Sequence, residues 1–118
     1  METSDKLAVL GKYKEAFQNS DLNIIREIYA DDAIVEDPVG TDVHNGIDAV
    51  CAFYQGALES GAKLSIDGAP CCAGSGMAYK LAIDASGMKI SAIGIMDFNE
   101  TGQIKSMRAY WGPENISA

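Results

Sequence analysis

The chain has 118 residues, of which 47% are hydrophobic, and this size and composition suit a single globular domain spanning residues 1–118. Its 17 acidic and 9 basic side chains give a net charge of -8, which argues against nucleic-acid partners and against binding to an anionic membrane surface. No apolar run approaches the ~18 residues of a membrane span, and the segment METSDKLAVL lacks the shape of a signal peptide, so we expect a cytoplasmic protein.

Helical periodicity marks the first part of the chain. Apolar and aromatic side chains at steps of three and four predict a helix over residues 5–19 with one buried face. Those side chains are Leu7, Leu10, Tyr13 and Phe17. Ser20 or Asp21 is then expected to cap a second helix. The predicted buried residues of that helix are Ile24, Ile25, Ile28 and Tyr29.

The segment DDAIVEDPVG predicts a short strand over residues 33–37. Pro38 ends this strand because proline cannot donate a hydrogen bond to a sheet ladder. Side chains alternate along a strand, so Asp37 shares one face with Val35 and Ala33.

A third helix is predicted within HNGIDAVCAFYQGALESG. Asn45 is the expected N-cap and Asp48 lies in the first turn, where a negative charge is favourable. His44 precedes this cap, and we expect it to be exposed and without a functional role. The buried face of the helix should comprise Val50, Phe53, Tyr54, Ala57 and Leu58.

After Gly61 the pattern changes to apolar or alternating runs. KLSID, MAYKLAID, KISAIGIMDF and QIKSMRAYW are separated by glycine-containing segments, which is typical of an antiparallel meander. Helices followed by strands predict an α+β fold, a cone in which three helices cover one face of a curved, mainly antiparallel sheet. An open cone of this kind can hold a small apolar ligand.

The common catalytic motifs are missing from the sequence. There is no G-x-S-x-G elbow and no Walker loop, and the single histidine, His44, argues against a hydrolase triad and against a structural zinc site. Cys51, Cys71 and Cys72 form no Cys-x-x-Cys pair and are interpreted as reduced, packed thiols. We therefore expect neither a metal nor another cofactor, and carboxylates and phenols remain as candidate groups.

Two residues are the candidate proton-transfer groups. If the Val35 face of the strand points inward, Asp37 places a carboxylate beside the apolar cavity; the alternative is a solvated or capping aspartate. Tyr13 lies on the apolar stripe of the first helix, so its buried phenol would be able to donate to an oxyanion. The alternative for Tyr13 is a core tyrosine bonded to a backbone carbonyl. Tyr29 and Tyr54 either support Tyr13 or simply pack.

Three stretches, YADDAIVEDPVG, NGIDAVCAFYQGAL and GQIKSMRAYW, closely resemble the bacterial Δ5-3-ketosteroid isomerases of the SnoaL-like, nuclear-transport-factor-2-like superfamily. The resemblance covers nearly the whole chain and implies the cone fold, a homodimer through the sheets, and a hydrophobic ligand such as a steroid. It puts the general base on Asp37, which would move a proton between C4 and C6 of a 3-oxo-Δ5-steroid, and the oxyanion donor on Tyr13. Tyr54, and more loosely Tyr29, match tyrosines that hydrogen-bond that phenol. The candidate apolar walls are Phe53, Met77, Met96 and Trp111.

One position departs from the family pattern. The second oxyanion donor of these isomerases is an aspartic acid that its apolar surroundings keep neutral. Counting back from MRAYW, this position is Gly94, which strand parity groups with Ala92 and Met96 on an apolar face. Asp97 falls on the opposite face and Asp84 on the neighbouring strand, so both are weak substitutes. A glycine at this position is expected to enlarge the cavity, and the loss of one donor to slow the reaction by about 10²–10³-fold.

Three functions follow from these observations. The first is a steroid Δ5-to-Δ4 isomerase, slowed by the missing acid, that uses Asp37 and Tyr13. The second is another enzyme of the superfamily that uses Asp37 on a different carbonyl or polyketide-like ligand. The third is a non-catalytic binder of an apolar small molecule, because one fold hosts many functions.

Overall fold

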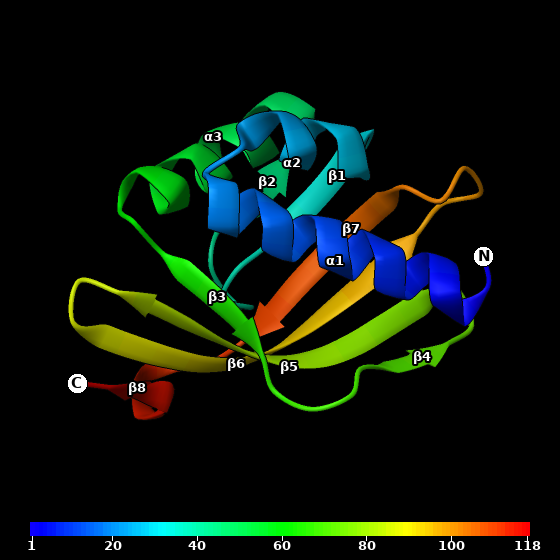
Figure 1. Cartoon of the computed structure of the whole chain (residues 1–118). Coiled ribbons are helices and arrows are strands. Elements are labelled where there is room, and N and C mark those ends of the chain that lie inside the picture. The colour runs from blue at the N-terminus through cyan, green and yellow to red at the C-terminus, as the bar shows by residue number, and fades with distance from the viewer.

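A computed structural model describes residues 1–118. Three α-helices cover one face of a curved sheet, and the C-terminal turn and short last strand lie on its other side (Figure 1). The elements are α1 (Thr3–Asn19), α2 (Leu22–Ile28), β1 (Tyr29–Glu36), β2 (His44–Asn45), α3 (Ile47–Glu59), β3 (Lys63–Ile66), β4 (Cys71–Ala73), β5 (Gly76–Ala85), β6 (Met88–Phe98), β7 (Ile104–Tyr110), the 3-10 helix η1 (Pro113–Asn115) and β8 (Ile116–Ser117).

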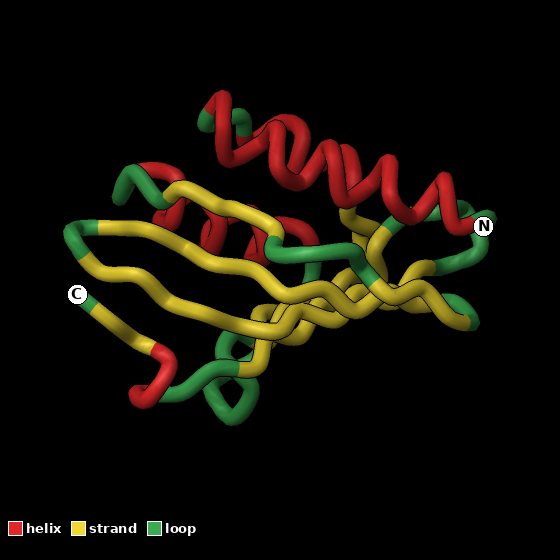
Figure 2. The backbone as a smooth tube through the Cα atoms, turned by 60° about the horizontal axis from the view of Figure 1, so that its bottom comes forward, coloured by secondary structure: helices red, strands yellow, loops and turns green.

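The sheet has the strand order β2-β1-β7-β6-β5-β3, with β4 attached to β5 and β8 to β6. β1 and β7 pair in parallel, and every other pair is antiparallel. The long strands β5 and β6 curve along their length beneath the helices (Figure 2). The predicted α+β fold, three helices on a curved and mainly antiparallel sheet, is confirmed.

The helices agree with the predicted periodicity, with one exchange of neighbours. The buried residues of α1 include Leu10, Tyr13 and Phe17. Leu7 is 41% exposed instead, and Lys6 is buried, with its Nζ donating to the carbonyl oxygen of Gly74 at 2.6 Å. Asp21 caps α2 as predicted, because its side chain accepts from the backbone N–H of Asn23 at 3.0 Å.

The short strands differ most from the sequence-based expectation. β1 begins at Tyr29, directly after α2, rather than at residue 33. Asn45 is not the N-cap of α3, because it pairs with Ile34 in the two-residue strand β2. The cap is Gly46, whose backbone N–H donates to the carbonyl oxygen of Ala33 at 2.8 Å.

One core of 25 buried side chains lies between the helices and the concave face of the sheet. Alternation along β6 places Ala92, Gly94, Met96 and Phe98 on this buried face, as predicted. Cys51 is buried, Cys71 exposed and Cys72 half-buried, and all three thiols are free. None of the helices has both the length and the apolar character needed to cross a membrane.

Candidate active site

A cavity of about 170 Å³ lies between the helices and the sheet. Twelve of its thirteen lining residues are hydrophobic, and Asp37 is the exception. The most buried part of the lining includes Tyr13, Tyr54 and Ala109, whereas Phe53 and Trp111 are half-buried. The cavity is therefore an apolar space with a single carboxylate.

Asp37 directly follows β1 and is held by an indole. Trp111 Nε1 donates to Asp37 Oδ1 at 2.8 Å, which fixes the direction of the carboxylate. Burial raises the pKa of Asp37, while the Trp111 hydrogen bond and the nearby charge of His44 partly oppose this rise. Asp37 is thus a stronger base than an exposed aspartate and keeps one oxygen free of the indole.

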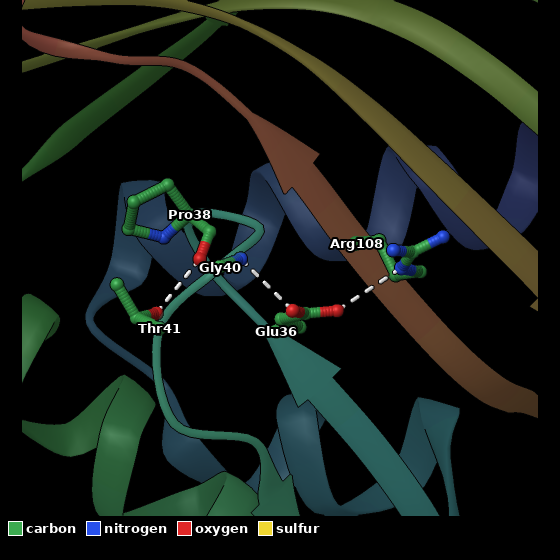
Figure 3. A network of polar contacts seen from close by, with 5 residues as sticks. All are labelled: Glu36, Pro38, Gly40, Thr41 and Arg108. Atoms are coloured by element: carbon green, nitrogen blue, oxygen red, sulfur yellow. Dashed lines mark hydrogen bonds and ion pairs between the residues drawn. The ribbon is translucent and has the colours of Figure 1, made fainter.

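A polar network at the end of β1 supports the backbone next to Asp37. Glu36 accepts from the backbone N–H of Gly40 at 2.9 Å and from Arg108 Nε on β7 at 3.1 Å (Figure 3). These two donors lower the pKa of Glu36, Gly40 having the larger effect. The network ties the turn after β1 both to the strand before it and to β7, so the carboxylate of Asp37 is presented from an anchored segment.

Three tyrosines from different elements form a buried chain of hydroxyls. Tyr13 on α1 is hydrogen-bonded to Tyr54 on α3 at 3.1 Å, and Tyr54 is also hydrogen-bonded to Tyr29 at the start of β1. Burial raises the pKa of all three phenols well above the ordinary value. They therefore remain neutral hydrogen-bond donors at physiological pH, and Tyr13 and Tyr54 are the members of the chain that line the cavity together with Asp37.

The space over Gly94 is filled, which corrects the expectation of a larger cavity there. Tyr79 on β5 pairs directly with Gly94 on β6. A Cβ atom on residue 94 would lie 2.5 Å from Cζ, 2.6 Å from Cε2 and 2.7 Å from Oη of Tyr79. The hydroxyl end of the Tyr79 ring therefore lies directly over the glycine, and the missing side chain makes room for a phenol rather than for ligand.

Gly94→Ala is expected to lower the free energy of unfolding by about 1–3 kcal/mol, the usual cost of overpacking. The added methyl group has to displace the ring of Tyr79, which is only 3% exposed and cannot move into solvent. Urea denaturation of the wild type and of the variant measures the loss. The matched background is Tyr79→Leu, in which Gly94→Ala should cost much less; an equal loss in both backgrounds contradicts the packing explanation.

The remaining predicted site residues divide into two groups. Phe53 and Trp111 line the cavity, as do Tyr13, Tyr54 and Asp37. The predicted site residues that lie in the core but outside the cavity lining are Tyr29, Met77, Gly94 and Met96. Sequence reasoning missed the polar role of Trp111, and it gave His44 no role, although the His44 ring packs on Phe53 with centroids 4.6 Å apart. It also missed Tyr79, which alternation along MAYKLAID places on the same buried face as Met77 and Leu81.

Comparison with known proteins identifies a matching family and a similar protein. The SnoaL-like domain profile matches residues 10–107. A steroid Δ-isomerase from Nocardioides simplex is 38% identical over 114 residues, which cover 92% of this chain and 91% of that protein.

Two solved structures share the fold over nearly their whole length. The epoxide hydrolase/cyclase-like enzyme SalBIII, described in pyran ring formation in the polyether salinomycin, has a TM-score of 0.92 and 25% identity, covering 100% of this chain and 99% of its own. RV0760c from Mycobacterium tuberculosis, in complex with estradiol-17beta-hemisuccinate, has a TM-score of 0.86 and 20% identity, covering 97% and 98%.

Proposed function

The chain belongs to the SnoaL-like domain family, and on that premise we propose that it is a steroid Δ-isomerase that converts 3-oxo-Δ5-steroids to their conjugated Δ4 isomers. The observation that carries this proposal is the pairing of one carboxylate with a neutral phenol in an otherwise apolar cavity. Asp37 is the base, and Tyr13 is the hydrogen-bond donor to the developing oxyanion.

The reaction moves one proton and leaves the composition of the substrate unchanged. Asp37 removes a proton from C4, and the electron pair of the broken C–H bond delocalises into a dienolate with negative charge on O3. Tyr13 donates to O3 and lowers the energy of this intermediate. Protonated Asp37 then delivers its proton to C6, so the double bond moves from C5–C6 to C4–C5 and the base is regenerated.

The physical properties of the site suit this sequence of steps. Burial raises the pKa of Asp37, which brings the base closer to the weakly acidic C4–H group. The raised pKa of Tyr13 keeps its proton in place as a donor. A volume of about 170 Å³ is below the ~300–1,000 Å³ of typical ligand pockets, so a steroid would fill the cavity and extend past its half-buried rim.

The relatives support the same substrate class. A protein that is 38% identical over most of the chain is a steroid Δ-isomerase. RV0760c, which shares the fold, has been crystallised with a steroid derivative. The proposed homodimer would cover the outer face of the sheet, where Ile93 and its pairing partner Tyr110 are exposed.

The direct test is turnover of 5-androstene-3,17-dione, followed by the ultraviolet absorbance of the conjugated enone product. A rate above that of buffer supports the proposal. Absence of turnover, with the steroid still bound, contradicts it.

A second candidate function is proton transfer on a polyketide-like ligand. It is favoured by the likeness to SalBIII, an epoxide hydrolase/cyclase-like enzyme with which the chain shares its fold at 25% identity. A screen of epoxide and carbonyl substrates with the wild type and with Asp37→Asn distinguishes this function from steroid isomerisation. An Asp37-dependent reaction of a non-steroid, without steroid isomerisation, would establish this alternative.

Trp111→Phe is expected to move the acidic limb of the pH profile of kcat/KM to higher pH. The base has to be ionised, so activity rises as pH rises through the pKa of Asp37. The indole hydrogen bond lowers that pKa, and its removal therefore raises it further. Phe53→Leu is the matched control, because it alters an apolar lining residue without a bond to Asp37. Equal limbs in wild type and Trp111→Phe would contradict the role of the indole.

A further inference from the structure

One row of paired residues runs across the sheet toward Asp37. Tyr79 on β5 pairs with Gly94 on β6, and Gly94 pairs with Ala109 on β7. On β1, Glu36 pairs with Arg108, the residue before Ala109. Asp37 directly follows Glu36 and lines the cavity together with Ala109. Gly94 and Ala109 are the small members of this row, so a long side chain from β5 has room to cross it toward the carboxylate.

The Tyr79 ring takes this path. The atoms that a Cβ on residue 94 would approach within 2.7 Å are Cζ, Cε2 and Oη, all at the hydroxyl end of the ring or next to it. The ring therefore leans from β5 over β6, in the direction of β7 and the turn that carries Asp37. Leu81 and Ala92, which neighbour Tyr79 and Gly94 along the same faces, line the cavity together with Ala109.

The Tyr79 hydroxyl differs from the other buried phenols. Tyr13, Tyr29 and Tyr54 bond one another, whereas Tyr79 makes none of the side-chain hydrogen bonds of the chain. No fully enclosed polar side-chain atom lacks a partner, so the Tyr79 oxygen is not fully enclosed. Tyr79 is not itself a cavity-lining residue, although its neighbour Leu81 lines the cavity. A buried phenol with an unused O–H group is a donor available to a ligand.

The electrostatics couple the Tyr79 hydroxyl to the candidate catalytic pair, Asp37 and Tyr13. Burial raises the pKa of Tyr79 well above its ordinary value, and electrostatic interaction with Tyr13 and Asp37 raises it further. Electrostatic interaction with Tyr79 in turn raises the pKa values of Tyr29 and Tyr54. Its phenol is thus neutral at physiological pH and lies within electrostatic range of both Asp37 and Tyr13.

We propose that Tyr79 is a second hydrogen-bond donor to the oxyanion, supplied from β5 across Gly94. This inference rests on the proposed isomerase function. A carboxyl oxygen on residue 94 would stand two bonds from its Cβ, and the Tyr79 oxygen lies 2.7 Å from that same point. The phenol oxygen therefore lies about as far from the Cβ position of residue 94 as the oxygen of an acid there would. On this proposal the site has two donors despite the glycine.

Tyr79→Phe is the decisive variant, because it keeps the ring over Gly94 and removes only the hydroxyl. We expect kcat to fall by about 10²-fold, the lower end of the effect of removing one oxyanion donor, with little change in KM or in the melting temperature. Tyr110→Phe is the matched control, because it removes a hydroxyl from a β7 residue that is 43% exposed and lies outside the cavity. Wild-type kcat in Tyr79→Phe would overturn the inference while leaving the isomerase function standing.

A binding measurement tests Tyr79 independently of turnover. Naphthols of decreasing pKa bind as neutral phenols or as anions that imitate the dienolate oxygen, and their ionisation is followed by absorbance. Tyr79→Phe should lower the affinity for the naphthol anion at least tenfold and leave the affinity for the neutral naphthol nearly unchanged. Equal weakening of both forms would indicate a packing role and overturn the inference. Because this readout needs no substrate turnover, it distinguishes a failed donor from a failed isomerase.

A paired substitution tests whether the two donor positions are equivalent. Tyr79→Ala removes the ring that blocks residue 94. Adding Gly94→Asp to that variant should therefore raise kcat at least tenfold above that of Tyr79→Ala alone. Failure of the added acid to raise kcat above that of Tyr79→Ala would contradict the equivalence.

Discussion

Asp37→Asn is expected to lower kcat for 5-androstene-3,17-dione by about 10²–10⁴-fold, the usual contribution of a positioned general base. Asparagine has nearly the same shape and its carbonyl oxygen still accepts from Trp111, so the indole contact at 2.8 Å can persist. What the variant loses is the basic oxygen that takes the C4 proton. Stopped-flow absorbance of the enone product, at saturating steroid, measures the change.

The same variant carries its own control for folding. Because the folded chain raises the pKa of Asp37, the folded state holds this proton to a higher pH than the unfolded state does. The carboxyl therefore costs stability as pH rises through its folded pKa, and asparagine avoids that cost. Asp37→Asn should raise the melting temperature at neutral pH and lose this advantage below the ordinary carboxyl pKa of about 4. Wild-type kcat in this variant would eliminate Asp37 as the base.

Tyr13→Phe is expected to lower kcat by about 10²–10³-fold, because it removes the hydroxyl proposed as the oxyanion donor. The ring remains and keeps its edge-to-face contact with Phe17, at a centroid distance of 5.3 Å, so folding should be little affected. Tyr54 loses one partner but retains Tyr29. The measurement is kcat and KM over the same pH range as for the wild type.

Tyr29→Phe is the control that separates contact with the substrate from support of the phenol chain. Its hydroxyl is already hydrogen-bonded to Tyr54, at the end of the chain away from Tyr13. A smaller loss of kcat than in Tyr13→Phe is therefore expected. If the two variants lost activity equally, the chain as a whole, rather than the Tyr13 hydroxyl, would be responsible, and the assigned role of Tyr13 would be wrong.

Hydrophobic periodicity alone was sufficient to predict the helices and strands that bury one face. The stripe through Leu10, Tyr13 and Phe17 predicted α1 and the inward direction of Tyr13 because helical spacing and burial coincide there. Alternation along β1 grouped Val35 with Asp37 on one face, and the structure shows that Val35 is fully buried. Asn45 shows the limit of local signals, because its place in a strand depends on pairing with Ile34 rather than on its own helix-capping preference.

The contact between Tyr79 and Gly94 was partly within reach of the sequence. A two-residue hairpin turn at Ser86 and Gly87, both with positive φ, fixes the register between β5 and β6. Counting outward from this turn pairs Tyr79 with Gly94. The direction of the ring is not encoded in the register, because it is decided by the packing of the surrounding core. The Trp111 bond to Asp37 is equally non-local, since it joins residues 74 positions apart.

The contact between Tyr79 and Gly94 also restricts the order in which substitutions can occur at these two positions. A residue larger than glycine at position 94 collides with the ring, so an acid can be gained there only after position 79 has become smaller. A substitution to a smaller residue at position 79 in turn removes the phenol before an acid at position 94 can replace it. Positions 79 and 94 are thus expected to vary together among related sequences, with a bulky residue at one accompanied by a small residue at the other.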